Sequence, residues 1–226
     1  MASKYTYSYF RISKTSGITA SAQKYRDLRL QALKTSPGSF SSTYEIESAF
    51  TEADWISRLT VPDREVFICA ATPSSDSDPA TTQWIGQVTL RGPASATDFT
   101  LPPDANQPPQ RPDTEEERWQ MLSLFTLPDH RGHGLGSKLC QASLDYLRDY
   151  KSDPKGVQVR LIVKKGNDVT IELYRRLGFA DAGRATLVEA LIANGDEELI
   201  PDDADRGSAM FVERQGVIMV LRLERG

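Results

Sequence analysis

The sequence predicts an α/β fold in which a mixed β-sheet has helices against its faces. Three observations lead to this fold class. Six segments have the alternating or continuous apolar pattern of strands, several segments between them repeat apolar residues at helical spacing, and the second half of the 226-residue chain alternates strand and helix. Because 39% of the residues are hydrophobic and 26% are charged, the chain can bury one core, and we expect a single domain over residues 1–226.

The first half of the chain supplies three strands and two helices. Residues 5–12 alternate aromatic and other side chains, which predicts an edge strand with three tyrosines on one face. A helix is predicted over residues 25–33, whose apolar side chains share one face and which a proline follows, and a second short helix carries Trp55. The apolar segments 65–71 and 83–90 are separated by a small, polar loop, so we expect antiparallel partners.

The second half supplies the centre of the sheet. Residues 119–127 are almost wholly apolar, which predicts a strand that is covered on both faces. A helix is then predicted over residues 135–146, a strand over 157–163, a helix over 170–177 and a last strand over 217–223.

Two segments interrupt this order. The first, at about residues 93–116, is rich in proline and nearly free of core residues, so we expect a mobile excursion. The second, at about residues 181–215, contains the acidic string NGDEELIPDDADRG. It would attract a cationic ligand if it folded over a binding site, and otherwise it is a solvated loop between two hairpin strands.

Composition excludes several classes of protein. The net charge of −4 and the isoelectric point near 5.3 do not fit a nucleic-acid-binding protein. The two cysteines have no CxxC spacing, and together with the two histidines they form no zinc pattern. The N-terminus lacks the apolar region of a signal peptide, and no apolar run is long enough to span a bilayer, so we expect a cytoplasmic protein with no membrane partner.

The junction LFTLPDHRGHGLGSKL, residues 124–139, joins the central strand to a helix through three alternate glycines with an arginine in front. Gly134 and Gly136 can take backbone angles closed to other residues, and they leave the amides at the start of the helix open to an anion such as a phosphate. Arg131 and Ser137 could add charge and hydrogen bonds. Neither the P-loop string nor the complete dinucleotide fingerprint is present, and a plain strand-to-helix turn is the alternative.

Two motifs resemble the GNAT acetyltransferase superfamily. The first is the spacing Arg-x-x-Gly-x-Gly from Arg131 to Gly136. The second is KKGNDVTIELYRRLGF, residues 164–179, which carries Asn167, Tyr174 and Gly178-Phe179 at the spacing of that family, although Thr170 replaces the usual alanine. The segments RLQAL, PGSF, WISRL and IGQVTL also resemble its first helices and third strand, so the resemblance covers most of the chain outside the two insertions.

The resemblance implies a GNAT-like fold, a mixed and mostly antiparallel sheet of six or seven strands that is splayed between the fourth and fifth strands. It also implies acetyl-CoA as co-substrate and no metal, with the diphosphate on the glycine turn and the pantetheine arm along the strand before it. The residues that would bind this cofactor are, by position, Leu124, Phe125, Thr126, Arg131, Gly132, His133, Gly134, Leu135, Gly136, Ser137, Asn167 and Tyr174.

The implied activity is transfer of an acetyl group, by direct attack on the thioester, to a primary amine of a small-molecule or amino-acid-like acceptor. A CoA-binding module of the same fold without catalysis is the alternative, and a generic phosphate-binding α/β domain is a third possibility. By resemblance alone, a homodimer is also possible.

Two residues of the second motif have roles in the implied reaction. Tyr174 would protonate the departing thiolate, although apolar residues surround it at helical spacing as they would a core tyrosine. Asn167 would contact the cofactor, and it also fits the N-cap of its helix; both can hold together.

The general base has several candidates, because the central strands contain no acid beyond their entrance. Glu116 and Glu117 at that entrance are both candidates, and we assign Glu117. Glu45 and Glu47 in the N-terminal helical region are alternatives that would act through water. Each of them also fits a solvated surface charge. The two histidines flank the glycine turn and, by the family geometry, lie far from the acetyl group.

Overall fold

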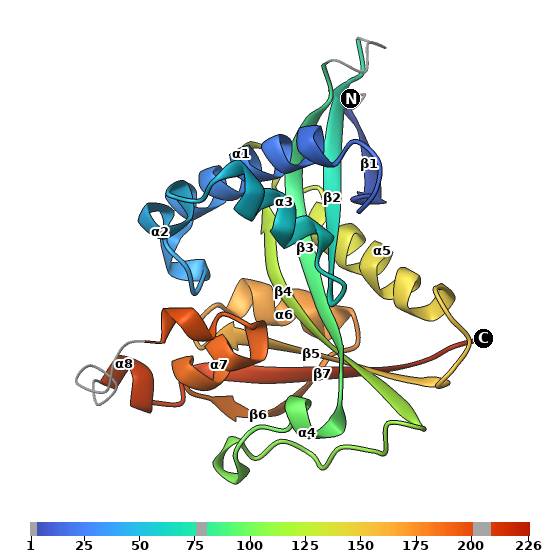
Figure 1. The fold of residues 1–226 in the computed structure, drawn as a ribbon, viewed down its shortest axis with the longest axis vertical. Coiled ribbons are helices and arrows are strands. Elements are labelled where there is room, and N and C mark those ends of the chain that lie inside the picture. The colour runs from blue at the N-terminus through green and yellow to red at the C-terminus, as the bar shows by residue number, and fades with distance from the viewer. Residues whose placement is uncertain (1–3, 76–80, 201–208) are drawn as a thin grey trace. The chain divides into compact units, whose positions relative to one another are not determined.

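The structure is a computed structural model that describes residues 4–75, 81–200 and 209–226. Seven strands and eight α-helices occur in these ranges (Figure 1). The strands are β1 (Tyr5–Arg11), β2 (Arg64–Pro73), β3 (Gln83–Ala94), β4 (Glu116–Thr126), β5 (Gly156–Lys164), β6 (Ala180–Ala185) and β7 (Gly216–Glu224). The helices are α1 (Ile18–Thr35), α2 (Tyr44–Ser48), α3 (Glu52–Thr60), α4 (Ala96–Phe99), α5 (Leu135–Asp149), α6 (Asp168–Arg176), α7 (Leu187–Asn194) and α8 (Ala209–Val212).

The strands form one sheet in the order β1-β2-β3-β4-β5-β7-β6. β4 pairs parallel with β5, whereas β1 with β2, β5 with β7, and β6 with β7 pair antiparallel. The predicted mixed sheet with flanking helices is therefore confirmed, with seven strands. β1 lies at one edge of the sheet, as its alternating aromatic pattern predicted.

Pairing between the two central parallel strands is short. It joins Glu116–Gln120 of β4 to Gly156–Arg160 of β5, and no later residue of β4 is registered with β5 in the described ranges. The segment Leu124–Thr126 lies beyond the paired part, as the expected splay of the sheet requires. Its backbone groups on that side are therefore not used in a ladder with β5.

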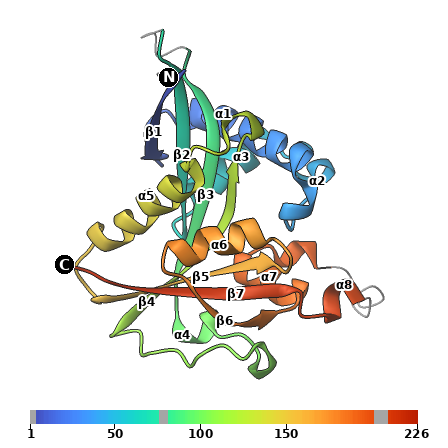
Figure 2. The same ribbon diagram turned by 180° about the vertical axis from the view of Figure 1, so that it is seen from behind.

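The contacts of the chain divide it into two compact units, residues 1–90 with 123–144, and residues 91–122 with 145–226. In the first unit, α1 and α3 cover one face of β2 and β3, and the first turns of α5 lie against the other face (Figures 1 and 2). The buried stripe of α1 meets Trp55 of α3, whose ring centroid lies 6.0 Å from that of Tyr25. Thr51 and Asp54 form a capping box that begins α3, so the short helix starts at a defined residue.

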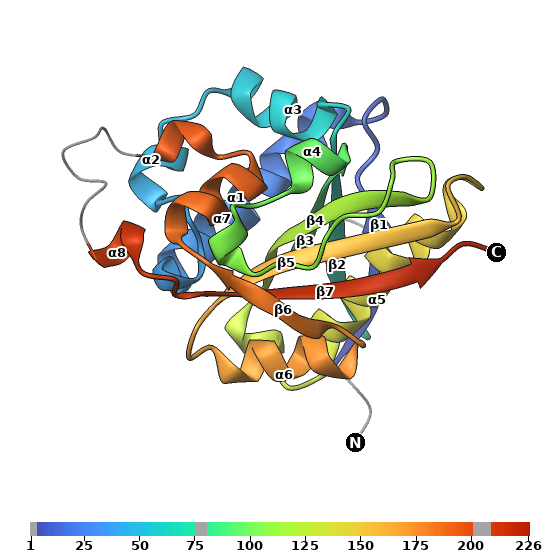
Figure 3. The ribbon, with the colours of Figure 1, turned by 90° about the horizontal axis from the view of Figure 1, so that it is seen from below.

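In the second unit, β5, β7 and β6 lie side by side, with α6 on one face and α4 and α7 on the other (Figure 3). Thr186 and Glu189 form a capping box that begins α7. β6 from its second residue and the whole of α7 fall within residues 181–215, where the sequence predicted an acidic insertion with no helix. Residues 201–208 of that insertion lie outside the described ranges.

The Pro-rich segment contributes to the core of the second unit, although the sequence predicted it to be nearly free of core residues. Phe99, Leu101 and Ala105 are buried. Leu101 and Ala105 belong to a cluster with Ala185, Ile218 and Val220 of the sheet, all of them buried. Packing of this kind stabilises the segment through removal of apolar surface from water.

Two buried arginines of the sheet hold the same segment. Nη1 of Arg160 donates to the carbonyl oxygen of Phe99 at 2.5 Å, and the guanidinium carbon lies 3.8 Å from the centroid of that ring. Arg118 donates to the carbonyl oxygen of Arg111 and, at 2.6 Å, to Asp113 Oδ1. Burial and the nearby charge of Arg91 lower the pKa of Arg160 to about 9. The segment therefore supplies acceptors to two buried guanidinium groups, of which Arg160 has one further acceptor in Gln120 of β4.

Candidate functional site

The glycine turn follows β4 in the first unit. The N–H of Leu127 donates to the carbonyl oxygen of Ile85 at 2.7 Å, and a short 3₁₀ turn, Pro128–His130, comes next. Gly132 and Gly134 have φ values of 81° and 70°, in the left-handed region that favours glycine. A Cβ at either position would meet no atom within 4 Å, so the glycines are needed for the backbone angle and the space above them is open.

The backbone amides of this turn are not satisfied within the protein. None of the N–H groups of residues 132–137 has a hydrogen-bond acceptor among the described residues, and the first helical bond of α5 runs from the N–H of Lys138 to the carbonyl oxygen of Gly134, at 3.1 Å. Unpaired amides and the positive end of a 15-residue helix favour a bound anion. The turn can therefore hold a phosphate or diphosphate without any rearrangement of other hydrogen bonds.

Arg131 and His133 make side-chain hydrogen bonds to backbone carbonyl oxygens in and before the turn. Nε of Arg131 donates to the carbonyl oxygen of Thr126 at 3.0 Å, which leaves both terminal guanidinium nitrogens without a partner among the described residues. Nδ1 of the exposed His133 lies 3.0 Å from the carbonyl oxygen of Arg131 and therefore donates to it. Of the residues expected here, Gly136 and Ser137 are half-buried in the first turn of α5, and Leu135 is buried.

His130 points to the edge strand. Its Nδ1 lies 3.3 Å from the hydroxyl oxygen of Tyr7, and its ring meets that of Tyr5 edge to face at 4.8 Å. Burial lowers the pKa of His130 and outweighs the opposing effect of the negative charge on Asp129. The histidine is thus part of an aromatic cluster with β1.

The strand segment before the turn presents alternate side chains to the core. Phe125 is buried, whereas Leu124 and Thr126 are half-buried. Ser123, directly before them, has a φ of 59°, which is unusual for a residue other than glycine inside a strand. The strand therefore changes direction at the residue that precedes the expected contacts with the acyl group.

The second motif lies in the other unit, at α6. Asn167 occupies the N-cap position, yet its side chain makes no capping hydrogen bond, and only its carbonyl oxygen accepts from the N–H groups of Thr170 and Ile171. The half-buried amide of the Asn167 side chain has no partner among the described residues and is open to a ligand. The predicted N-cap position of Asn167 is therefore confirmed, although its side chain makes no capping hydrogen bond.

Tyr174 is buried on the inner face of α6. Its ring meets that of Phe179 edge to face at 5.5 Å, and its carbonyl oxygen accepts from the N–H of Phe179 at 3.0 Å. Gly178, with a φ of 93°, ends the helix and turns the chain back so that this contact can form. The sequence Tyr-x-x-x-Gly-Phe thus has a local structural explanation: the glycine ends the helix, and the phenylalanine then packs against the tyrosine.

Glu117 is buried in a network of donors within the second unit. It accepts from Nε1 of Trp119 at 2.7 Å, from the hydroxyl of Tyr150, from Lys151 Nζ at 2.5 Å and from Arg225 Nη2 at 2.9 Å. Burial alone would raise the pKa of Glu117, but the hydrogen bonds from Lys151 and Tyr150 and the charge of Arg225 outweigh it, so the pKa is lowered. An anion that is held in this way is a poor proton acceptor.

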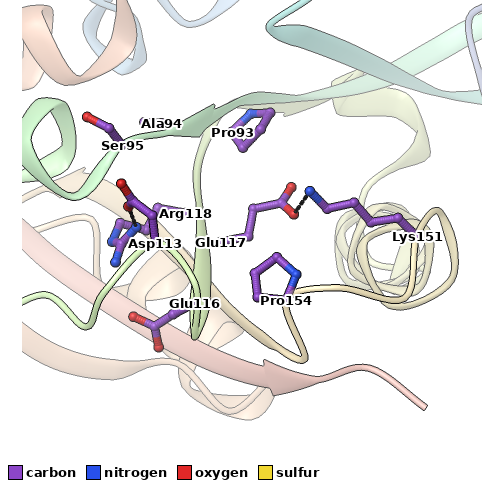
Figure 4. A pocket seen from close by; sticks show the side chains of 9 residues that line it. All are labelled: Pro93, Ala94, Ser95, Asp113, Glu116, Glu117, Arg118, Lys151 and Pro154. Atoms are coloured by element: carbon purple, nitrogen blue, oxygen red, sulfur yellow. Dashed lines mark hydrogen bonds and ion pairs between the residues drawn. The ribbon is translucent and has the colours of Figure 1, made fainter.

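A hollow of about 220 Å³ lies beside Glu117, between the end of β3 and the start of β4 (Figure 4). Figure 4 shows Lys151 reaching Glu117 and Arg118 next to Asp113. Glu116, on the same wall, accepts from Nε of Arg222 at 2.9 Å. Because the carboxylates of the hollow already face cations of the protein, a cationic ligand would have to compete with built-in ion pairs.

Glu47, the buried candidate of the N-terminal helical region, is also ion-paired. Arg29 donates to it from Nε and Nη2, with a shortest distance of 2.6 Å, and Nη2 of Arg58 lies 3.9 Å away. Burial opposes ionisation of Glu47, but hydrogen bonds and charge from Arg29 outweigh this and lower its pKa. Glu45 is exposed.

The described residues offer neither a metal site nor a reactive thiol. No group of three or more His, Cys, Asp or Glu side chains there is arranged to hold a metal ion. Cys69 and Cys140 are free and buried, and burial raises the pKa of their thiols to about 11 and about 12. No helix in the same ranges is both long and apolar enough to cross a bilayer.

Comparison with known proteins identifies a family. The model of the acetyltransferase (GNAT) family matches residues 40–179, whereas no curated protein sequence matches the chain. Arabidopsis thaliana NAA60 in complex with a bisubstrate analogue is 16% identical, with a TM-score of 0.52 over 98% of this chain and 100% of that one.

Two further solved structures have the same fold. A GNAT acetyltransferase from Streptococcus pneumoniae is 12% identical, with a TM-score of 0.54 over 96% of this chain and 100% of its own. PaiA N-acetyltransferase from Thermoplasma acidophilum, solved with coenzyme A, is 14% identical, with a TM-score of 0.52 over 95% and 98%.

Proposed function

Since the chain belongs to the GNAT family of acetyltransferases, we propose that it is an acetyl-CoA-dependent N-acetyltransferase whose acceptor is a primary amine of a small or amino-acid-like molecule. The observation that carries this proposal is the row of unpaired amides, residues 132–137, at the head of α5. We propose that the whole chain serves as one catalytic domain.

The residues of the turn fit a diphosphate. The amides supply directed donors, the helix supplies a favourable dipole, and the terminal nitrogens of Arg131 supply charge that no described residue neutralises. The open space above Gly132 and Gly134 allows an anion to approach the backbone closely. Complexes of PaiA with coenzyme A and of NAA60 with acetyl-CoA support this cofactor for the fold.

Acetyl-CoA would supply an acetyl group activated as a thioester. Transfer forms a bond between the acceptor nitrogen and the acetyl carbon and breaks the carbon–sulfur bond, while the ammonium loses one proton and the thiolate gains one. We assign the stabilisation of the carbonyl oxygen to backbone N–H groups of Leu124–Thr126. The hydroxyl of Tyr174 is proposed to donate the proton to the thiolate, whose parent thiol has a pKa of about 8.5.

Glu117 is proposed to have a structural role in place of the catalytic one that the sequence suggested. Its four donors and its lowered pKa favour a permanently charged anchor. Removal of the proton from an acceptor ammonium, with a pKa of about 10, therefore falls to another group or to water.

The acceptor class is supported by charge. The net charge of −4 favours a cationic or neutral acceptor over a polyanion. A primary amine fits this charge, because it is protonated in solution and is attracted before it loses its proton.

The proposal is tested by following the free thiol that is released from acetyl-CoA in the presence of a panel of small amines and amino acids. We expect thiol release that depends on both substrates, and we expect acetyl-CoA to raise the melting temperature in proportion to the logarithm of its concentration. Failure of acetyl-CoA or CoA to shift the melting temperature would overturn the cofactor assignment.

A CoA-binding module without catalysis is the competing function. The observation in its favour is that the three buried carboxylates offered as bases, Glu47, Glu116 and Glu117, are all engaged in ion pairs. Binding of acetyl-CoA without turnover of any amine in the panel would favour this module over the enzyme.

A further inference from the structure

The change of direction in β4 at Ser123 is held from outside the strand. The φ of Ser123 is 59°, and such a conformation persists in a residue other than glycine only where the surroundings stabilise it. Nη1 of Arg29, in α1, donates to the hydroxyl oxygen of Ser123 at 3.2 Å. Nε2 of Gln87, in β3, donates to the carbonyl oxygen of Ser123 at 3.4 Å. Both the side chain and the backbone of the residue are thus tethered.

Arg29 is itself fixed in place. Its side chain is almost fully buried, and Nε and Nη2 grip the carboxylate of Glu47, which has no exposed surface. The guanidinium carbon lies 4.5 Å from the centroid of the Phe40 ring. A guanidinium that forms a two-nitrogen fork with one carboxylate keeps a fixed orientation, so its remaining nitrogen is aimed at Ser123.

The kink at Ser123 is important because of its place in the strand. Ser123 directly precedes Leu124–Thr126, the strand segment that we assign to the carbonyl oxygen and the pantetheine arm, and this segment lies beyond the pairing of β4 with β5. Rotation about the backbone of Ser123 re-aims the N–H of Leu124. A donor whose N–H···O angle falls below about 120° loses most of its effect on a developing negative charge.

We propose that Arg29, anchored by Glu47, is a positioning residue that holds Ser123 in its left-handed conformation and so aims the backbone amides of β4 at the acyl carbonyl. This inference rests on the proposed function, because it requires acetyl-CoA along β4. It differs from a purely structural role for the ion pair. In that case, loss of the pair would lower the stability of the fold but leave the polarisation of the bound acetyl carbonyl unchanged.

The two roles can be separated with a variant that removes both charges. Arg29→Met alone would leave the buried Glu47 with Arg58, at 3.9 Å, as its remaining cation, and the protein would be strongly destabilised. The double variant Arg29→Met with Glu47→Leu replaces the pair by apolar groups of similar size, a change that folded proteins often tolerate. Ser123→Gly provides a second, milder variant, because glycine accepts the same φ but has no hydroxyl for Arg29 to hold. Arg26→Met, at an exposed pair with Asp27 on the same helix, is the matched control.

The decisive measurement is the carbonyl stretching frequency of acetyl-CoA, labelled with ¹³C in the acetyl group, in complex with each variant. Relative to acetyl-CoA free in solution, we expect the wild type and Arg26→Met to shift this frequency to lower values. The double variant and Ser123→Gly should lose at least about half of that shift. Calorimetry should give CoA dissociation constants within about twofold of the wild type, because the diphosphate turn is untouched, and kcat should fall by at least about tenfold.

An equal carbonyl shift in the wild type and the double variant would overturn the positioning role. The infrared measurement requires only that acetyl-CoA binds, so it tests the role of Arg29 even if no amine is acetylated. Absence of turnover would count against the proposed enzyme and not against the role of Arg29. If the wild type bound acetyl-CoA with no carbonyl shift at all, the assignment of the β4 amides, and with it this inference, would be wrong.

Discussion

Nη2 of Arg225, the penultimate residue of the sequence, lies 2.9 Å from Oε2 of Glu117, and neither side chain has more than 3% of its surface exposed. The two residues are 108 positions apart, so this ion pair joins the end of β7 to the start of β4. Arg225 also donates to the carbonyl oxygens of Leu147 and Pro154. One arginine thus joins separate segments of the second unit.

Replacement of Arg225 by Met should lower the free energy of unfolding by about 3 kcal/mol, because Glu117 would remain buried with one cation fewer. Urea unfolding, followed by tryptophan fluorescence, measures this loss. Arg148→Met is the control, since Arg148 makes an exposed pair with Asp145 and should change the stability by less than about 0.5 kcal/mol. Similar losses in the two variants would show that the buried network does not carry the stability assigned to it.

Stability should also depend on pH through Glu117 and Glu47. The pKa of each is lower in the folded protein than its ordinary value of about 4.3, so each stabilises the fold fully above that value, and the contribution is lost as the pH falls through the folded pKa. We expect the free energy of unfolding to be flat near neutral pH and to fall below about pH 4.3. Glu117→Gln should be less stable at neutral pH and should show a shallower fall, and an equally steep one would remove Glu117 from this dependence.

Gly134→Val should weaken CoA binding by at least about tenfold. Valine is strained at a φ of 70°, and its side chain would occupy the open space through which a phosphate reaches the amides. Gly17→Val is a matched control, because Gly17 has a φ of 61° and equally open surroundings at the start of α1. Calorimetric titration with CoA should therefore separate the two variants, and comparable affinities would refute the diphosphate assignment.

Tyr174→Phe should lower kcat by about 100-fold and leave the CoA dissociation constant nearly unchanged. Phenylalanine preserves the edge-to-face contact with Phe179, so packing is kept while the hydroxyl proton is lost. Thiol release under saturating acetyl-CoA measures kcat, and its pH profile should lose the limb that reports the general acid. Full activity with an unchanged profile would exclude Tyr174 from the chemistry.

Local pattern was sufficient for much of the fold. The apolar run that forms β4, the glycines that open α5 and the Tyr-x-x-x-Gly-Phe string that closes α6 are all short-range features, and the structure forms them where the sequence predicts them. The strand β6 and the helix α7 were missed, because the acidic string NGDEELIPDDADRG dominated the interpretation of that region. A signal was present in TLVE, residues 186–189, which is the pattern of a capping box ahead of an apolar run.

Long-range polar contacts could not be predicted from the sequence. Glu117 is a candidate base by its place at the entrance of a central strand, but its environment is set by Tyr150, Lys151 and Arg225, which are distant in the chain. The burial of the Pro-rich segment likewise depends on Arg160, whose partner Phe99 lies 61 positions earlier. Neither spacing nor composition encodes which charged side chain will find which distant carbonyl.

The row of unpaired amides at residues 132–137 has a practical consequence for anyone who handles this protein. With the coenzyme at these amides, as we propose, a ligand concentration about a hundredfold above the dissociation constant would add about 2.7 kcal/mol to the free energy of unfolding. A preparation without coenzyme would lack this contribution. Shelf life, resistance to proteases and yield on expression would then depend on the coenzyme content of the buffer or the host. Two laboratories would measure different unfolding free energies for the same protein if their buffers differed in coenzyme.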